Sequence, residues 1–316
     1  MKIALICPYF GKMPNYFNYV LKSCEFNPDI NWIIFTDDRE KFNYPKNVKV
    51  IYMSFTKFRE LIQSKFDFNI RLETPYKLCD YKPVYGFVLE EYLEGFDYWG
   101  HCDIDCIFGD LKSFLSEPLI KGYDKICYLG HLTIYKNNSE NNQRFKLTYE
   151  GNSYKDIFSE DKIYVFDEDL HKLSMNTIYK EHNYDFYKKP IFGDISCLYY
   201  DFRLYVYDDN CEYRLEKKSN QIFKWENGKV FSIKYNEGIL ESNEFGYIHF
   251  QKRTMKVDHG DLHSVKEFII KPNNISSEKI NVINILNNQE KKLIYAPFFK
   301  QKIKALKYKL SRLIGD

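Results

Sequence analysis

Two aspartates separated by one residue carry the strongest chemical signal in this chain. Asp103 and Asp105 follow the apolar segment Tyr98–Cys102, which has the composition of a buried β-strand. Side chains alternate between the faces of a strand, so both carboxylates are expected to point the same way. A hard cation such as Mg²⁺ or Mn²⁺ relieves their repulsion and usually takes further ligands from substrate phosphates. The pair therefore indicates an enzyme that uses a nucleotide-diphosphate substrate.

The same spacing also occurs in solvated turns that carry no metal. Here the pair follows a strongly hydrophobic strand and precedes Gly109, so it lies where a buried strand emerges. This context favours the metal site over the turn.

The composition of the 316 residues excludes some classes of protein. Hydrophobic residues make up 44% of the chain, enough for a sizeable core in one large domain. The net charge of +2 argues against a dedicated nucleic-acid-binding protein. Aromatic residues reach 18%, which suits a packed core and also a cleft where rings stack on sugars.

The eight cysteines are scattered and form no Cys-x-x-Cys motif. His101, Cys102 and Cys106 flank the aspartates, but their spacing does not fit a zinc knuckle. We expect reduced thiols and a cytoplasmic protein. The sequence shows no signal peptide and no run of 18 apolar residues that predicts a transmembrane helix.

The first 130 residues alternate between strand and helix patterns. Predicted strands are 3–7, 32–35, 48–53 and 98–102, and predicted helices are 13–24, 56–65 and 83–93. This alternation predicts a mostly parallel sheet with right-handed crossovers, which binds ligands at the carboxyl ends of its strands. The aspartates at such ends are Asp37, Asp38, Asp103 and Asp105.

The remainder of the chain does not continue this alternation of strand and helix patterns. Residues 136–190 are polar and irregular, and Asn227-Gly228 between alternating segments predicts a β-hairpin over 222–235. Residues 270–295 are expected to form a linker and a helix. Lysines and apolar residues over 298–314 predict a basic amphipathic helix, which either contacts a membrane surface or docks on the domain.

Four segments together resemble bacterial glycosyltransferases of the GT-A type, especially those of capsule and lipopolysaccharide gene clusters. These segments are 3–11, 35–38, 76–83 and 99–109. The resemblance covers about residues 1–255. It implies a GT-A-like, Rossmann-like α/β fold, in which helices flank a mostly parallel sheet beside a small antiparallel β section.

The resemblance also implies a domain organisation. A glycosyltransferase domain would span 1–255, with a nucleotide-sugar-binding half at 1–130 and an acceptor half at 131–255. A C-terminal helical extension would follow at 256–316.

In such enzymes the Asp-x-Asp pair carries a divalent metal, Mn²⁺ or Mg²⁺, and the nucleotide of the donor. The resemblance implies that Asp105 ligates the metal and that Asp103 contacts the ribose, the metal or both. A late histidine often completes the site, and His249 fits this role, with Lys252 near the diphosphate. The alternative for His249 is a hydrogen-bonded core histidine.

The acidic cluster at 167–169 has two interpretations. A carboxylate at this distance from the pair often acts as the catalytic base of an inverting enzyme, by taking a proton from the acceptor hydroxyl. Glu168 is the first candidate, followed by Asp169 and then Asp167. Alternatively, the cluster is the acidic first turn of a helix, and the enzyme is then retaining.

Further residues are candidates for substrate contacts, although each also has an ordinary structural interpretation as turn, core or solvated surface. Asp194 could also be catalytic. The donor candidates are Tyr9, Phe10, Asp37, Asp38, Lys77 and Lys82, and the acceptor candidates are His131 and Asp194.

We therefore expect a metal-dependent glycosyltransferase, with inversion favoured. It would transfer a sugar from a UDP-sugar to a lipid-linked or surface-glycan acceptor at the cytoplasmic membrane face. The enzyme alternative is a nucleotidyltransferase that uses a nucleoside triphosphate. The non-enzyme alternative is a glycan-binding or assembly subunit. Nucleotide-binding glycine loops and common hydrolase motifs do not occur.

Overall fold

The structure is a computed structural model. It describes residues 1–168, 173–208, 212–236, 239–251, 253–258 and 262–278, together with Val282, Leu286, Phe299 and Ile303.

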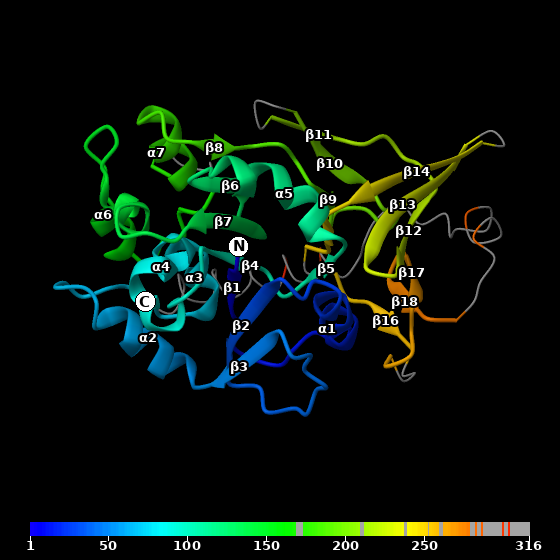
Figure 1. The fold of residues 1–316 in the computed structure, drawn as a ribbon, viewed down its shortest axis with the longest axis horizontal. Helices are drawn as coiled ribbons and strands as arrows, with labels where there is room; N and C mark the ends of the chain where they lie inside the picture. Colours follow the sequence, from blue (N-terminus) through cyan, green and yellow to red (C-terminus); the bar gives the residue numbers. More distant parts are fainter. Residues whose placement is uncertain are drawn as a thin grey trace.

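A mixed seven-stranded sheet forms the middle of the part that the structure describes (Figure 1). The first four strands in its order are mutually parallel, whereas β7 runs antiparallel to both β4 and β6. The α/β class and the Rossmann-like parallel sheet predicted from the sequence are confirmed. In sheet order, the strands are β3 (Val48–Tyr52), β2 (Ile30–Thr36), β1 (Ile3–Pro8), β4 (Tyr98–Cys102), β7 (Leu132–Lys136), β6 (Lys125–Leu129) and β8 (Phe186–Tyr187).

Helices cover this sheet, and side-chain caps mark where several of them begin. Ser54 caps one helix by accepting a hydrogen bond from Lys57 N, and Asp110 caps another through Ser113 N. The α-helices are α1 (Phe17–Glu25), α2 (Phe55–Gln63), α3 (Leu78–Tyr81), α4 (Tyr85–Val88), α5 (Leu111–Lys121), α6 (Tyr154–Phe158) and α7 (Met175–Glu181). The 3-10 helices are η1 (Pro75–Lys77), η2 (Lys82–Val84), η3 (Glu90–Tyr92) and η4 (Asn141–Lys146).

Two predicted helices have different bounds in the structure. The helix expected from residue 13 begins only at Phe17, because Met13 N donates to Asp38 Oδ2 and so belongs to the preceding loop. The helix expected over 83–93 is divided into η2, α4 and η3. Its interruption falls at Leu89, whose φ of −110° and ψ of 25° leave the α-helical region.

A smaller five-stranded sheet joins distant parts of the chain. Strand β15, the fourth in the order of this sheet, pairs in parallel with β9 and antiparallel with β5. In sheet order, the strands are β11 (Tyr213–Leu215), β10 (Leu204–Tyr207), β9 (Phe192–Ile195), β15 (Tyr247–His249) and β5 (Cys106–Phe108).

A third, mostly antiparallel sheet lies at one end of the molecule, drawn in yellow and orange in Figure 1. It contains the predicted hairpin of β12 (Gln221–Glu226) and β13 (Lys229–Asn236). Asn227 and Gly228 form its turn with φ of 47° and 83°, as a type I′ turn requires. The other strands are β14 (Ile239–Phe245), β16 (Lys256–Val257), β17 (Glu267–Lys271) and β18 (Asn274–Ser276).

The expectation of a linker and helix over 270–295 is wrong for its first part. Residues Glu267–Lys271 and Asn274–Ser276 are antiparallel strands, joined by a turn in which Asn273 has a φ of 61°. Strand β17 also pairs with β12, so the sheet continues past residue 255. The division of the chain at 255 remains a prediction.

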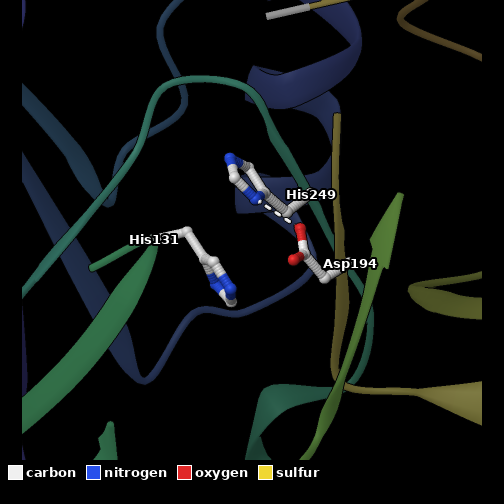
Figure 2. Close-up of side chains that lie close together, drawn as sticks. All are labelled: His131, Asp194 and His249. Atoms are coloured by element: carbon white, nitrogen blue, oxygen red, sulfur yellow. Dashed lines mark hydrogen bonds and ion pairs between the residues drawn. The ribbon is translucent and has the colours of Figure 1, made fainter. Parts of the chain in front are cut away.

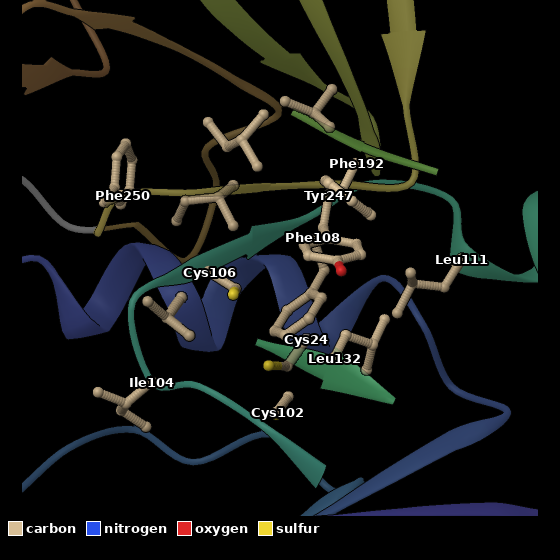
Figure 3. Packing of buried hydrophobic residues seen from close by; sticks show 14 of the residues in the cluster. Cys24, Cys102, Ile104, Cys106, Phe108, Leu111, Leu132, Phe192, Tyr247 and Phe250 are labelled. Atoms are coloured by element: carbon tan, nitrogen blue, oxygen red, sulfur yellow. The ribbon is translucent and has the colours of Figure 1, made fainter. Parts of the chain in front are cut away.

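A packed core supports the segment that contains the two aspartates. Cys102, Ile104 and Cys106 are buried around the pair, and Cys24 of α1 and Phe108 pack with them (Figure 3). All described cysteines are free thiols, whereas Cys211 lies outside the described residues. The buried residues on either side of each aspartate therefore anchor the segment that carries the two carboxylates.

No helix within the described residues combines the length and apolar character needed to cross a membrane. The predicted basic helix over 298–314 lies outside the described residues apart from Phe299 and Ile303.

Candidate metal and donor site

Asp103 and Asp105 lie in a turn between β4 and β5, rather than in a continued strand as the alternation argument assumed. Backbone hydrogen bonds hold this turn on both sides. Asp103 N donates to His131 O at 3.1 Å, and Phe250 N donates to Asp105 O at 3.0 Å. The two carboxylates therefore converge because of long-range backbone contacts, and not because of strand alternation.

Strand β15 brings His249 to the two aspartates. Its register places His249 opposite Cys106 of β5 on one side and opposite Asp194 of β9 on the other. His249 Nε2 lies 3.4 Å from Asp105 Oδ1 and 3.9 Å from Asp103 Oδ2. One donor atom from each of the three residues lies within 4.8 Å of the others.

Asp194 and Gln251 orient the imidazole of His249. Asp194 Oδ1 lies 2.9 Å from His249 Nδ1 (Figure 2). Gln251 Nε2 donates to both oxygens of Asp194 at 2.8 Å. Burial would lower the pKa of His249, but the charges of Asp105 and Asp194 raise it well above its usual value. Burial would likewise raise the pKa of Asp194, but the hydrogen bond and charge of His249 lower it.

The residues present fit a divalent cation. Two carboxylates and one imidazole nitrogen form the donor set, and a carboxylate hydrogen-bonded to the other nitrogen is the usual partner of a metal-binding histidine. The side chains of Asp103 and Asp105 are 34% and 14% exposed, so the group opens to solvent on the side of Asp103. Asp103, Asp105 and His249 could therefore hold Mn²⁺ or Mg²⁺.

His131 lies behind His249 rather than in an open acceptor cleft. It is 4% exposed, its ring packs 4.5 Å from that of His249, and its Nδ1 lies 2.8 Å from the Tyr247 hydroxyl. Burial, followed by the charge of His249, lowers its pKa to about 3. Asp194 is equally buried. His131 and Asp194 were expected to bind the acceptor. In the structure both are buried and contact His249 instead.

Lys82 connects the aspartate pair to the acidic cluster. Its Nζ donates to Asp103 Oδ1 at 2.8 Å and to Gly130 O at 2.9 Å, and lies 3.3 Å from Asp167 Oδ2. Burial would lower the pKa of Lys82, but the two carboxylates raise it well above its usual value. The lysine therefore stays charged and partly neutralises the acidic groups around it.

Asp167 and Glu168 lie against Gly130. Glu168 Oε1 accepts a hydrogen bond from Gly130 N at 2.7 Å, and a Cβ on Gly130 would lie 2.2 Å from Asp167 Oδ2. Burial raises the pKa of Asp167 to about 8, although Lys82 opposes this shift. Burial also raises the pKa of Glu168. Asp169 lies outside the described residues.

The loop after β1 lies beside the pair. Asp37 Oδ1 accepts from Gly11 N, and Asp38 Oδ2 accepts from Met13 N, both at 2.7 Å, so these carboxylates shape the loop. Burial, followed by the charge of Asp105, raises the pKa of the half-buried Tyr9. Phe10 packs on Phe55 and Phe58 of α2, and its role in donor binding remains a prediction, as it does for Tyr9, Asp37 and Asp38.

The structure does not bring Lys77 to the pair. Its Nζ donates to Asp80 Oδ2 at 2.8 Å and to the carbonyls of Ile157 and Lys162, and the residue is 2% exposed. A lysine held in this way cannot reach a diphosphate, so the prediction that Lys77 contacts the donor is wrong.

Lys252 lies outside the described residues, and its neighbour Arg253 has a structural role. Arg253 is 2% exposed and donates to the carbonyls of Ser196, Tyr199 and Tyr200. The arginine therefore holds the loop after β9, and its burial excludes it from a diphosphate site.

The family described as "Family of unknown function (DUF6625)" matches residues 5–279. The chain belongs to this family. A search of curated proteins found no match.

Two solved structures are similar at low identity. The galactosyltransferase LgtC, in complex with donor and acceptor sugar analogs, is 10% identical over 60% of this chain and 75% of that chain, with a TM-score of 0.34. Mouse xyloside xylosyltransferase 1, apo form, is 8% identical over 62% of this chain and 88% of that chain, with a TM-score of 0.36. At such TM-scores the assignment of an activity depends on the site itself.

Sequence reasoning missed the roles of Gln251, Gly130 and Tyr247 in this DUF6625 protein. Gln251 and Tyr247 are each two residues from His249 and orient the histidines, whereas Gly130 gives room to Asp167. Strand alternation before His249 was the signal that could have indicated Tyr247, whereas Gln251 lies in the turn after β15 with a φ of 48°, where alternation no longer applies.

Proposed function

We propose that this protein is a metal-dependent glycosyltransferase that moves a sugar from a nucleotide-sugar, UDP-linked, to a glycan acceptor. One observation carries the proposal. Asp103 and Asp105 at the end of β4 and His249 at the end of β15 form one group of oxygen and nitrogen donors at the carboxyl end of a parallel strand. Such donors suit a divalent cation that binds a diphosphate.

In this proposal, Asp103, Asp105 and His249 hold the metal, and Asp194 fixes the orientation of the imidazole. When bound, the cation stabilises the negative charge of the leaving nucleoside diphosphate. Lys82 supplies a second positive charge beside Asp103. Tyr9, Asp37 and Asp38 lie on the loops next to the pair and would contact the nucleoside.

Glu168 is our candidate for the catalytic base of an inverting reaction. It is only partly buried, whereas Asp167 is 1% exposed and paired with Lys82. An acceptor hydroxyl could therefore approach Glu168 but not Asp167. The carboxylate would take the hydroxyl proton while the oxygen attacks the anomeric carbon and the diphosphate leaves.

The first experiment measures thermal stabilisation and product release for a panel of nucleotide-sugars with and without Mn²⁺. A true donor should raise the melting temperature in a Mn²⁺-dependent manner and should slowly release UDP through hydrolysis. Asp105→Asn should abolish both effects. The exposed Asp29, whose carboxylate pairs with Lys112, provides the control Asp29→Asn, which should behave as the unaltered protein.

The products separate this proposal from its alternatives. A nucleotidyltransferase would consume a nucleoside triphosphate and release pyrophosphate, whereas a glycan-binding subunit would release neither product. If no nucleotide-sugar stabilises the protein in the presence of Mn²⁺, the glycosyltransferase assignment is wrong.

We also propose that the acceptor is a lipid-linked oligosaccharide of surface-glycan assembly, handled at the cytoplasmic membrane face. The basic and apolar residues over 298–314 support contact with anionic lipid. Sedimentation with vesicles of phosphatidylglycerol and phosphatidylcholine tests this contact. If the protein binds vesicles of phosphatidylcholine alone as strongly as vesicles that also contain phosphatidylglycerol, the proposed contact with anionic lipid is contradicted.

A further inference from the structure

The hairpin of β10 and β11 carries three tyrosines on the face that contains Asp194. Tyr205 is the register partner of Asp194 on the neighbouring antiparallel strand, and paired residues point to the same face. Tyr207 is two residues further along β10, and Tyr213 of β11 is its partner. Tyr205, Tyr207 and Tyr213 therefore stand side by side, and we call them the tyrosine ledge.

Ring contacts connect the ledge to the proposed metal ligands Asp103, Asp105 and His249, which we call the metal group. The centroid of Phe192 lies 4.7 Å from that of His131 and 5.4 Å from that of Tyr207. Tyr213 lies 5.5 Å from Tyr207 and 5.3 Å from Tyr205. Because His131 packs on His249, an unbroken series of rings runs from the metal group to the surface.

The ledge becomes more exposed with distance from the metal group. Phe192 is buried, Tyr205 and Tyr207 are half-buried, and Tyr213 is 64% exposed. An edge contact with Tyr205 and a tilted contact with Tyr207 hold the Tyr213 ring while most of its surface stays open. An aromatic ring that is held and uncovered, and that is connected to the reaction centre through a series of packed rings, indicates a binding surface rather than core.

We infer that the tyrosine ledge binds the acceptor, and that the acceptor is an oligosaccharide rather than a monosaccharide. This inference rests on the proposed glycosyltransferase function. A pyranose ring presents apolar C–H faces that pack on aromatic rings, and hydroxyl edges that bond to phenol groups. Tyr205 and Tyr207 are about 7 Å apart along the strand, which exceeds the width of one sugar ring.

The loop between β9 and β10 is built to hold the ledge in place. Arg253 donates to the carbonyls of Ser196 and Tyr200, and the Ser196 hydroxyl donates to Tyr205 Oη at 3.2 Å. The buried arginine therefore ties the base of the hairpin to the segment that follows His249. The reaction centre and the ledge share one rigid support.

The test uses a printed array of bacterial surface oligosaccharides that contain two or more pyranose units. We expect the unaltered protein to bind at least one of them, and Tyr213→Ala to weaken that binding about tenfold. Tyr213→Phe keeps the ring and should retain most of the binding. Tyr76→Ala removes a tyrosine of similar exposure, 59%, on η1 and should change nothing.

Two results would overturn the inference. One is the absence of binding to every oligosaccharide on the array, and the other is equal binding by Tyr213→Ala and the unaltered protein. Hydrolysis of the nucleotide-sugar without acceptor should be unchanged in Tyr213→Ala. If the unaltered protein hydrolyses no nucleotide-sugar, the proposed function is contradicted. Glycan binding through Tyr213 would still be measurable in that case.

Discussion

His249 and Asp194 lie opposite each other on parallel strands, with Nδ1 of the histidine 2.9 Å from Oδ1 of the aspartate. This contact directs the other ring nitrogen, Nε2, toward Asp103 and Asp105. Gln251 donates to both oxygens of the same carboxylate and so limits its rotation. The geometry of the metal group is thus decided by a residue that contributes no ligand to it.

Replacing this orienting carboxylate should weaken the metal group without removing a ligand. Asp194→Asn keeps the shape of the side chain but removes the charge that fixes the imidazole. We expect the affinity for Mn²⁺ to fall about 10–100-fold. Isothermal titration calorimetry measures the change, with Asp29→Asn as a surface control. An unchanged affinity would show that the imidazole is held by other contacts.

Lys82 lies between two carboxylates, and its removal should be costly. Lys82→Met leaves the charge of Asp103 without its cation, and leaves the buried carboxyl of Asp167, whose pKa of about 8 already disfavours ionisation, without the ammonium group that it contacts. We expect the free energy of unfolding in urea to fall by about 3 kcal/mol. The double variant Lys82→Met/Asp167→Asn should recover part of this loss, because the amide cannot ionise and the buried side chain then no longer requires the charge of the lysine. A loss below about 1 kcal/mol would mean that the pairing is solvent-screened.

Gly130 has no room for a side chain. The Cβ of Gly130→Ala would lie 2.2 Å from Asp167 Oδ2 and 2.9 Å from Glu168 Oε1. Both carboxylates would have to move, so we expect a loss of about 2 kcal/mol in unfolding free energy and slower donor turnover. Gly193→Ala is the matched control, since its nearest neighbour is Ile248 Cγ2 at 3.3 Å. Equal behaviour of the two variants would contradict the steric argument.

Asp258 joins the third sheet to α1 and should make stability depend on pH. It accepts hydrogen bonds from the Tyr19 hydroxyl and from Ser277 N, the latter at 2.7 Å. Burial would raise the pKa of Asp258, but these hydrogen bonds hold it below its usual value of 3.8. The ionised form is therefore favoured in the folded protein, and its contribution is complete above the unfolded pKa.

Asp258→Asn should lower the unfolding free energy by about 2 kcal/mol at pH 7. The difference from the unaltered protein should shrink as the pH falls below about 4 and through the lower folded pKa, because Asp258 is then protonated in both states. Urea unfolding at pH 7 and at pH 3 measures both differences. A difference that stays constant between these pH values would exclude the proposed linkage.

Local patterns were sufficient for much of the fold. The apolar runs near Ile3, Trp32, Val48 and Tyr98 became the four parallel strands, and Asn227-Gly228 became the predicted hairpin turn. These features depend on side-chain period and on backbone preferences within a few residues. The strands over 267–276 were missed because β17 is held in the sheet by its pairing with β12, which is distant in the sequence.

Lys77 and Lys82 show where local information ends. Both precede the same apolar segment and had the same expected role, yet Lys77 is buried against Asp80 and Lys82 lies between Asp103 and Asp167. Asp80 lies within three residues of both lysines, so the local sequence does not show which of them pairs with it. Only the packing of distant segments decides which lysine meets the aspartate pair.

By itself, the sequence determined the order of the strands along the chain and the position of two aspartates where a buried strand ends. The tertiary structure alone decided that His249 reaches those aspartates and that Asp194 aims it. The tertiary structure also decided that the tyrosines of β10 and β11 lie on the same face of the sheet as Asp194. The physical reason is that side-chain period is a short-range property, whereas strand order and register arise from burial of the whole chain.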